Sequence, residues 1–78
     1  AQLTRFRAKI LYKENMIKEY KRKCGEDMWD YLVAQDDVGI DRIFRKYYGK
    51  VEDVKMDIRT LQDEIVKLER ETTSTNQT

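Results

Sequence analysis

The sequence predicts an all-α protein, an antiparallel helical hairpin whose long helices pack in a coiled-coil-like manner. The first observation is a heptad seam in the second half of the chain, where apolar residues are separated alternately by four and three positions. This seam consists of Ile40, Phe44, Tyr47, Val51, Val54, Ile58, Leu61, Ile65 and Leu68. The second observation is that the 78 residues include no proline and only three glycines, which favours long helices.

The first long helix is expected over residues 3–24. Its apolar residues follow the same spacing, with Lys13 as the one polar interruption. Thr4 is a candidate N-cap, and Gly25 stands where a helix commonly ends with a left-handed residue. Lys13 either extends outward to solvent or pairs with a carboxylate of a neighbouring chain and thereby fixes the register.

A short capping helix is expected over residues 26–35, and the second long helix over residues 38–71. Acidic residues in the first turn favour the short helix, because they complement the helix dipole. Asp36 or Asp37 is expected to cap the long helix that follows. The apolar side chains expected to close this end of the core are Met28, Leu32 and at least part of Trp29.

One helical domain is expected over residues 1–71, followed by a disordered tail over residues 72–78, which contain no apolar residue. A chain this short buries only about 60% of the surface exposed by its unfolded form, so close helix packing or self-association must supply stability. The single cysteine excludes an intrachain disulfide. No apolar run approaches the ~20 residues that span a membrane, so we expect an intracellular, cytoplasmic protein.

The two long helices differ in length, and an antiparallel alignment leaves part of the seam uncovered. At ~1.5 Å per residue they measure ~33 Å and ~50 Å. With Leu3 opposite Leu61, the last seam residues have no partner within the chain, so a homo-oligomer, with a dimer favoured, or a helical protein partner is expected. The predicted partner interface consists of Val54, Ile58, Leu61, Ile65 and Leu68.

Charge is segregated along the chain although the net charge is only +1. Residues 1–25 carry eight basic and two acidic groups, residues 26–41 carry six acidic groups only, and residues 42–50 carry four basic groups only. The hairpin would bring the basic segments together with tyrosines, which suggests nucleic-acid binding as an alternative function. The candidate polyanion-binding residues are Lys21, Arg22, Lys23, Arg42, Arg45 and Lys46. The competing interpretation is that these groups only balance residues 26–41.

No catalytic residue, metal ligand or cofactor is predicted. The chain has no histidine and no glycine-rich phosphate loop. Residues 36–41 resemble a calcium loop superficially, but Arg45 stands where the closing glutamate belongs. Cys24 follows three basic residues, which could lower its pKa, yet it lies on the seam and is expected to be a buried structural thiol. The sequence therefore predicts a non-enzymatic helical module that self-associates or docks a partner helix, with nucleic-acid binding as the alternative.

Overall fold

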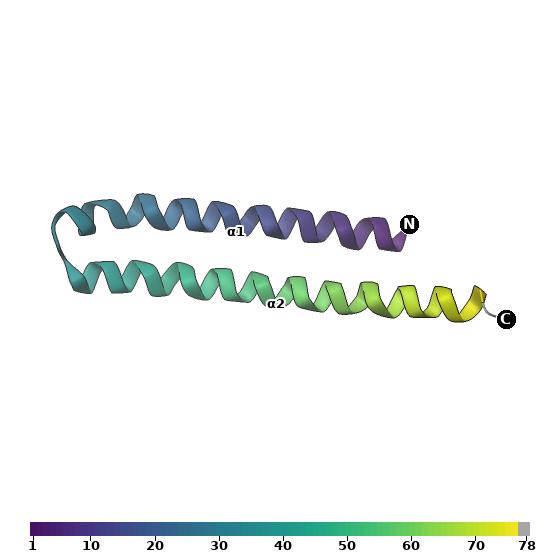
Figure 1. Ribbon diagram of the computed structural model, residues 1–78. Helices are drawn as coiled ribbons and strands as arrows, with labels where there is room; N and C mark the ends of the chain where they lie inside the picture. The colour runs from purple at the N-terminus through teal and green to yellow at the C-terminus, as the bar shows by residue number, and fades with distance from the viewer. Residues whose placement is uncertain (77–78) are drawn as a thin grey trace.

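The computed structural model describes residues 1–76, and the side chains of residues 1–72. Two helices, α1 (Gln2–Val33) and α2 (Asp37–Asn76), lie antiparallel and form a hairpin (Figure 1). The molecule measures 66 × 16 × 10 Å and has a radius of gyration of 18.5 Å. A compact chain of this length would have a radius of about 12 Å. The predicted all-α hairpin is confirmed, and the molecule is elongated rather than compact.

The separate capping helix predicted over residues 26–35 is not present, because α1 continues without a break to Val33. Gly25 lies inside α1, and its φ is not positive. A glycine inside a helix costs about 1 kcal/mol relative to alanine. Beyond it, Met28 and Tyr31 are half-buried, and the apolar surface that they remove from water offsets this cost. The predicted N-cap is also wrong, since α1 begins at Gln2 rather than after Thr4.

The turn between the helices, residues 34–36, is closed by a Schellman motif. Gln35 adopts the left-handed conformation, with φ 54°. Its N–H donates to the carbonyl of Leu32 at 3.1 Å, and the N–H of Asp36 donates to the carbonyl of Tyr31 at 2.9 Å. The left-handed residue that ends the first helix is therefore a glutamine, ten residues beyond the predicted glycine.

We expect Gln35→Gly to stabilise the protein by about 1 kcal/mol, because a non-glycine residue in the left-handed region costs ~1–2 kcal/mol. The greater freedom of glycine in the unfolded chain removes part of this gain. Urea unfolding followed by circular dichroism measures the change. Gln62→Gly, the same substitution inside α2, should instead destabilise by about 1 kcal/mol. A loss of stability in both variants would contradict the role given to the turn.

Of the two residues predicted as candidate caps, Asp36 is the one that caps α2. Its Oδ1 accepts a hydrogen bond from the N–H of Gly39 at 3.1 Å. Its carbonyl accepts the first helical bond from the N–H of Ile40 at 2.9 Å. Asp37 follows in the first turn, where the helix dipole favours a carboxylate.

Tyr31 packs directly on Gly39 and closes the loop end of the hairpin. A Cβ atom on Gly39 would lie 2.2 Å from Cδ1 of Tyr31 and 2.8 Å from its Cγ. Arg42 also contacts this ring: its Nη2 donates to the Tyr31 hydroxyl at 3.1 Å, and its guanidinium lies 5.5 Å from the ring centroid. The predicted closure by three apolar side chains is largely wrong: Met28 is half-buried, but Trp29 and Leu32 are 65% and 46% exposed.

The core is small and lies on α2, where Tyr47, Val51, Val54 and Ile58 are buried. The predicted seam is wrong at the loop end, where Phe44 is 52% exposed and Ile43 is half-buried in its place. Core residues there follow an eleven-residue spacing in both helices, namely Ile40, Ile43, Tyr47 and Val51 in α2, and Tyr20, Cys24, Met28 and Tyr31 in α1. Such a spacing relaxes the left-handed supercoil that a strict heptad imposes, and it moves Phe44 off the core.

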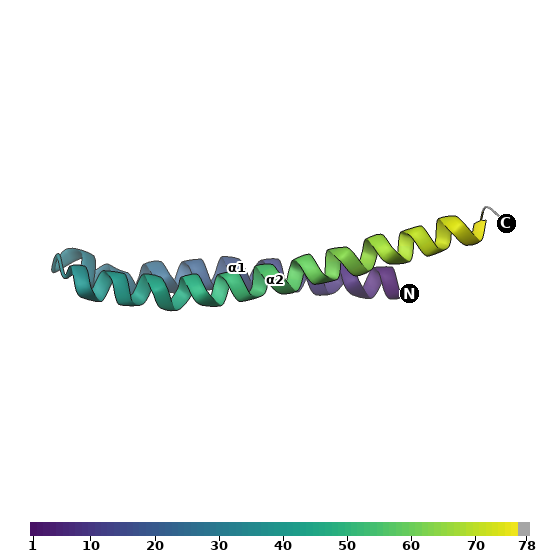
Figure 2. The ribbon, with the colours of Figure 1, turned by 90° about the horizontal axis from the view of Figure 1, so that it is seen from below.

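The register differs by about one heptad from the predicted one, in which Leu3 lies opposite Leu61, because residues 26–33 extend α1 and do not form a separate helix between the two long ones. Lys13 Nζ lies 3.2 Å from Asp57 Oδ2, and Arg7 Nη2 lies 3.2 Å from Glu69 Oε1. The start of α1 therefore runs beside Ile65 and Leu68, which are half-buried. The predicted apolar overhang is wrong, and only the polar end of α2 extends beyond α1 (Figure 1). The two helices cross at a shallow angle (Figure 2).

Helix α2 continues to Asn76, past the predicted end at residue 71. Residues 77–78 of the predicted tail lie outside the described residues, and the division into a domain over 1–71 and a tail over 72–78 stays a prediction. In the described part of the chain, neither helix contains a stretch long and apolar enough to cross a membrane.

Candidate functional site

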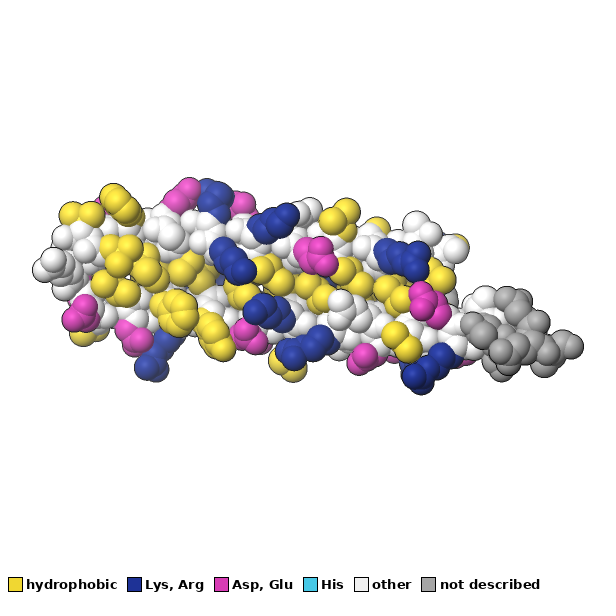
Figure 3. Space-filling model, viewed as in Figure 1, with side chains coloured by type: hydrophobic (Ala, Val, Ile, Leu, Met, Phe, Trp, Pro, Cys, Tyr) yellow, Lys and Arg dark blue, Asp and Glu magenta, His cyan; other side chains and the backbone are white. Residues whose placement is uncertain are grey.

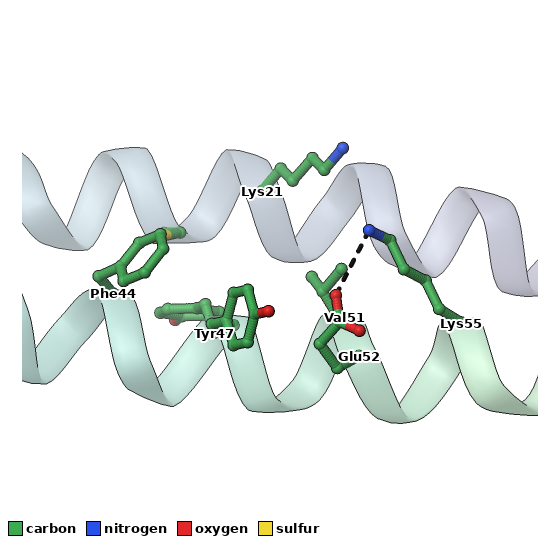
Figure 4. Close-up of a pocket in the computed structure, with 8 residues that line it drawn as sticks. Lys21, Phe44, Tyr47, Val51, Glu52 and Lys55 are labelled. Atoms are coloured by element: carbon green, nitrogen blue, oxygen red, sulfur yellow. Dashed lines mark ion pairs between the residues drawn. The ribbon is translucent and has the colours of Figure 1, made fainter.

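A shallow groove with an apolar floor runs between α1 and α2 on one face of the hairpin (Figure 3). Near the loop end it encloses about 350 Å³. Its apolar lining consists of Cys24 on α1 and of Phe44, Tyr47, Tyr48 and Val51 on α2 (Figure 4). Because an apolar hollow of this kind is exposed to water in the isolated chain, it is a candidate contact surface.

Two aromatic rings form one side of this groove. Phe44 and Tyr48 lie one helical turn apart on α2, with ring centroids 5.6 Å apart, and both are more than half exposed. Exposed aromatic side chains of this size are typical of contact surfaces, because they bury much apolar area at low entropic cost. Sequence reasoning missed the pair by assigning Phe44 to the core. The signal was present in the spacing, since Ile43 also continues an apolar seam toward Val51.

Charged side chains rim the groove. Lys21 stands on the α1 wall, whereas Glu52 and Lys55 form an ion pair on the α2 wall at 3.4 Å (Figure 4). The groove continues along α2 past Ile58 to Arg59. The site thus combines an apolar floor with charges of both signs.

The predicted polyanion-binding residues do not form one free basic cluster. Arg22 donates hydrogen bonds to Glu19 and Glu26, which raise the pKa of its guanidinium and lower the pKa of the Glu19 carboxyl. Arg45 pairs with Asp41 at 2.9 Å. These carboxylates compete with any external phosphate for the same donors.

The remaining members of that set are dispersed. Arg42 binds Tyr31 at the loop end, as described above, and Lys46 lies 5.3 Å above the ring of Tyr47. Lys21 stands on the groove wall, and Lys23 is exposed on α1. Nucleic-acid binding by these residues stays a prediction.

The predicted partner interface lies mostly between the two helices of one chain. Val54 and Ile58 are buried there, and Leu61, Ile65 and Leu68 are half-buried on the same seam. The overhang on which this interface was based is absent, and its role toward a partner stays a prediction.

Lys13 pairs with a carboxylate of its own chain, Asp57, rather than with one of a neighbouring chain. The lysine is half-buried, with 26% of its side chain exposed, whereas the aspartate is exposed. A register role inside the hairpin is consistent with this geometry, although an ion pair that is partly exposed contributes no more than about 1 kcal/mol.

A hydrogen bond from the Tyr47 hydroxyl to Asp27 Oδ2 links the two helices beside the core. This bond, together with burial, raises the pKa of Tyr47 to about 12. Burial, followed by the charge of Asp27, also raises the pKa of the neighbouring Cys24 thiol. The basic residues before Cys24 therefore do not activate it, and the thiol lines the groove as an apolar group.

Unfolding under alkaline conditions tests the Tyr47 hydrogen bond. The ordinary tyrosine pKa is 10.0 and the folded-state value is about 12. The unfolded chain therefore loses this proton first, and the stabilisation is complete below pH 10 and disappears as the pH rises toward 12. We expect the melting temperature of the wild type to fall between pH 10 and 12 more steeply than that of Tyr47→Phe. Tyr48→Phe, which removes an exposed hydroxyl, should retain the wild-type slope, and equal slopes in all three proteins would contradict the assignment.

Among the described residues, no three cysteine, aspartate or glutamate side chains gather in a way that could hold a metal ion. Comparison with protein-family models, with curated proteins and with solved structures found no match.

Proposed function

We propose that this chain is a non-enzymatic helical interaction module that completes its core by packing against further helices, with a second copy as the favoured partner. The observation that carries the proposal is the exposed surface, 6306 Å² for a chain of 9.4 kDa. A compact monomer of that mass exposes about 5,000 Å². The hairpin therefore leaves uncovered an area comparable to one side of a protein–protein interface, about 800 Å² or more.

The poor coverage of apolar side chains supports the same proposal. Among the residues whose side chains are described, only four hydrophobic side chains are buried, and none is fully buried. Several large apolar side chains close to the turn are exposed, namely Trp29, Leu32, Val33 and Val38. A two-helix hairpin has no third helix to cover such groups, and small scaffolds of this kind usually gain stability by oligomerisation.

Sedimentation equilibrium of the isolated chain over about 5–500 μM tests the proposal. We expect a mass above 9.4 kDa that rises with concentration, and a melting temperature that rises in parallel, because association stabilises the folded chain by mass action. A strict monomer with concentration-independent unfolding would contradict self-association.

The alternative of nucleic-acid binding has less support. The arginines of the candidate set are engaged within the chain, and the net charge is +1. A dedicated binder of polyanions usually presents a basic surface whose donors remain available for phosphates. Titration of a short DNA duplex at low salt would detect such a function.

A further inference from the structure

We propose that two copies of this chain pack face to face through the groove, with both loops at the same end and a two-fold axis along the groove. In this four-helix bundle, α1 of each copy lies on α2 of its partner. The inference rests on the proposed self-association and adds the surface and the orientation to it.

The register of the hairpin determines which residues would meet. Lys13 lies at the level of Asp57, and Arg7 at the level of Glu69. A two-fold axis along the groove preserves these levels, so the α1 wall of one copy meets the α2 wall of its partner at the same height. Residues of the α1 wall and the α2 wall that would meet in the dimer are therefore those that lie at the same height within one chain.

Near the loop, a position without a side chain on the α1 wall lies at the same height as two bulky aromatic side chains on the α2 wall. Gly25 lies one helical turn from Lys21 on the α1 wall, and a Cβ there would meet no atom within 4 Å. Nothing inside the chain therefore explains a glycine that weakens α1. At the same height on the α2 wall stand the exposed rings of Phe44 and Tyr48. In the proposed dimer these rings would pack on the bare backbone at Gly25 of the partner copy.

Charges of opposite sign stand at matching heights on the two walls in the middle of the hairpin. On α1, Lys21, Lys18 and Glu14 follow one another at helical spacing, and all three are exposed. On α2, Glu52 stands at the height of the two lysines, and Lys55 and Arg59 stand near the height of Glu14.

The α1 charges are also available. In the described part of the chain, Lys18, Lys21 and Glu14 make no ion pair. On the α2 wall of the other copy they would meet Glu52 and Lys55, which pair with each other within one chain, and Arg59. Complementary charges of this kind select orientation more than affinity.

The opposite orientation, with the loops at opposite ends, matches these charges less completely. It would place each α1 wall on the α1 wall of the other copy. That wall carries Arg7, Lys18 and Lys21 but only one acid, Glu14. Because α1 spans residues 2–33, Lys18 would then lie near Lys18 of the other copy at the middle of the interface, which is repulsive, whereas Lys21 would lie opposite Glu14.

Distance measurement between spin labels at the loop tests the orientation. In a Cys24→Ala background, Ala34→Cys carries a nitroxide at the exposed end of α1. Helices in a bundle lie about 8–10 Å apart, so labels at the same end should be separated by less than about 30 Å. With the loops at opposite ends the labels would be separated by more than about 40 Å, because α1 has 32 residues.

A pair of glycine variants tests the surface. Gly25→Leu and Gly49→Leu each fill a helical position where a Cβ meets no atom within 4 Å, but Gly49 lies away from the groove lining. Both should raise the helicity of the monomer at low concentration, since leucine is the better helix former. Only Gly25→Leu should weaken the dimer, by about tenfold or more, because the added side chain occupies the space for the aromatic rings twice in each dimer.

A charge exchange tests the pairing of the walls. Lys21→Glu and Glu52→Lys should each weaken the dimer about tenfold, and the double variant should restore most of the affinity. Lys67→Glu, an equal change of charge away from the groove, should leave the affinity close to that of the wild type.

Different results would overturn the proposed self-association and the proposed face-to-face dimer. A strict monomer overturns both. A dimer with separated loop labels, or one unaffected by Gly25→Leu and by the charge exchange, overturns this inference and leaves the proposed self-association intact.

Discussion

Gly39→Ala should lower the free energy of unfolding by about 2–3 kcal/mol, a large loss for a protein of this size. The added methyl would lie 2.2 Å from Cδ1 of Tyr31, and the contact extends to the ring atom nearest the backbone, Cγ, at 2.8 Å. Rotation about the Cβ–Cγ bond cannot relieve a clash with Cγ. Either the Tyr31 side chain must leave its rotamer and its contact with Arg42, or the turn or the start of α2 must shift. Urea unfolding followed by circular dichroism measures the loss.

Two further variants make this prediction specific. Gly49→Ala, in open space inside the same helix, should stabilise by about 1 kcal/mol. In a Tyr31→Ala background the ring is absent, so Gly39→Ala should become neutral or slightly stabilising, and the double-mutant cycle should give a strong coupling between the two sites. A cost of Gly39→Ala that persists without the ring would contradict the steric explanation.

Ile58→Ala should destabilise the hairpin by about 2–4 kcal/mol, because it removes buried methyl groups and leaves a cavity. Ile58 is 9% exposed and lies one helical turn from Val54, another of the four buried hydrophobic side chains in the described part of the chain, so its loss removes a substantial part of a very small core. Met56→Ala is the matched control, because Met56 is a large apolar residue on the same helix but is 59% exposed. Its truncation should change the stability by no more than about 0.5 kcal/mol.

Unfolding of both variants is best followed at the lowest practicable concentration, so that association does not add to the measured stability. Equal losses for Ile58→Ala and Met56→Ala would show that the packing between α1 and α2 does not determine the stability of the isolated chain.

The hairpin and the cap of α2 could be predicted because the heptad seam and Asp36 are local signals. The end of α1 could not be predicted from local signals, since Gly25 is compatible both with a left-handed helix end and with a helix interior. Whether α1 continues through Gly25 depends on two free-energy terms: the glycine costs about 1 kcal/mol of helix propensity, and the burial of Met28 and Tyr31 offsets that cost. That burial exists only when α2 is already in place.

The groove was missed for the same reason, because the predicted end of the first helix determined the predicted alignment of the two long helices. A separate capping helix over residues 26–35 aligns the long helices about one heptad away from the observed register. That alignment leaves the apolar end of α2 without a partner and does not reveal the groove. A seam through Phe44 keeps a strict heptad, whereas a seam through Ile43 is equally apolar but departs from it. The sequence gives no reason to prefer the second seam unless the residues of α1 that it meets are known. Local spacing therefore determines that the helices pair, and the position of the turn determines which side chains remain exposed.

The turn at residues 34–36 has a further consequence for the order in which the hairpin forms and opens. Contacts beside the turn, such as Tyr31 on Gly39, close short segments of chain, whereas the Arg7–Glu69 pair closes the longest. Loop-closure entropy rises with segment length, so the helices should zip together from the turn toward the free ends. Amide hydrogens should therefore exchange with solvent most slowly beside the turn and the buried core, and fastest at the start of α1.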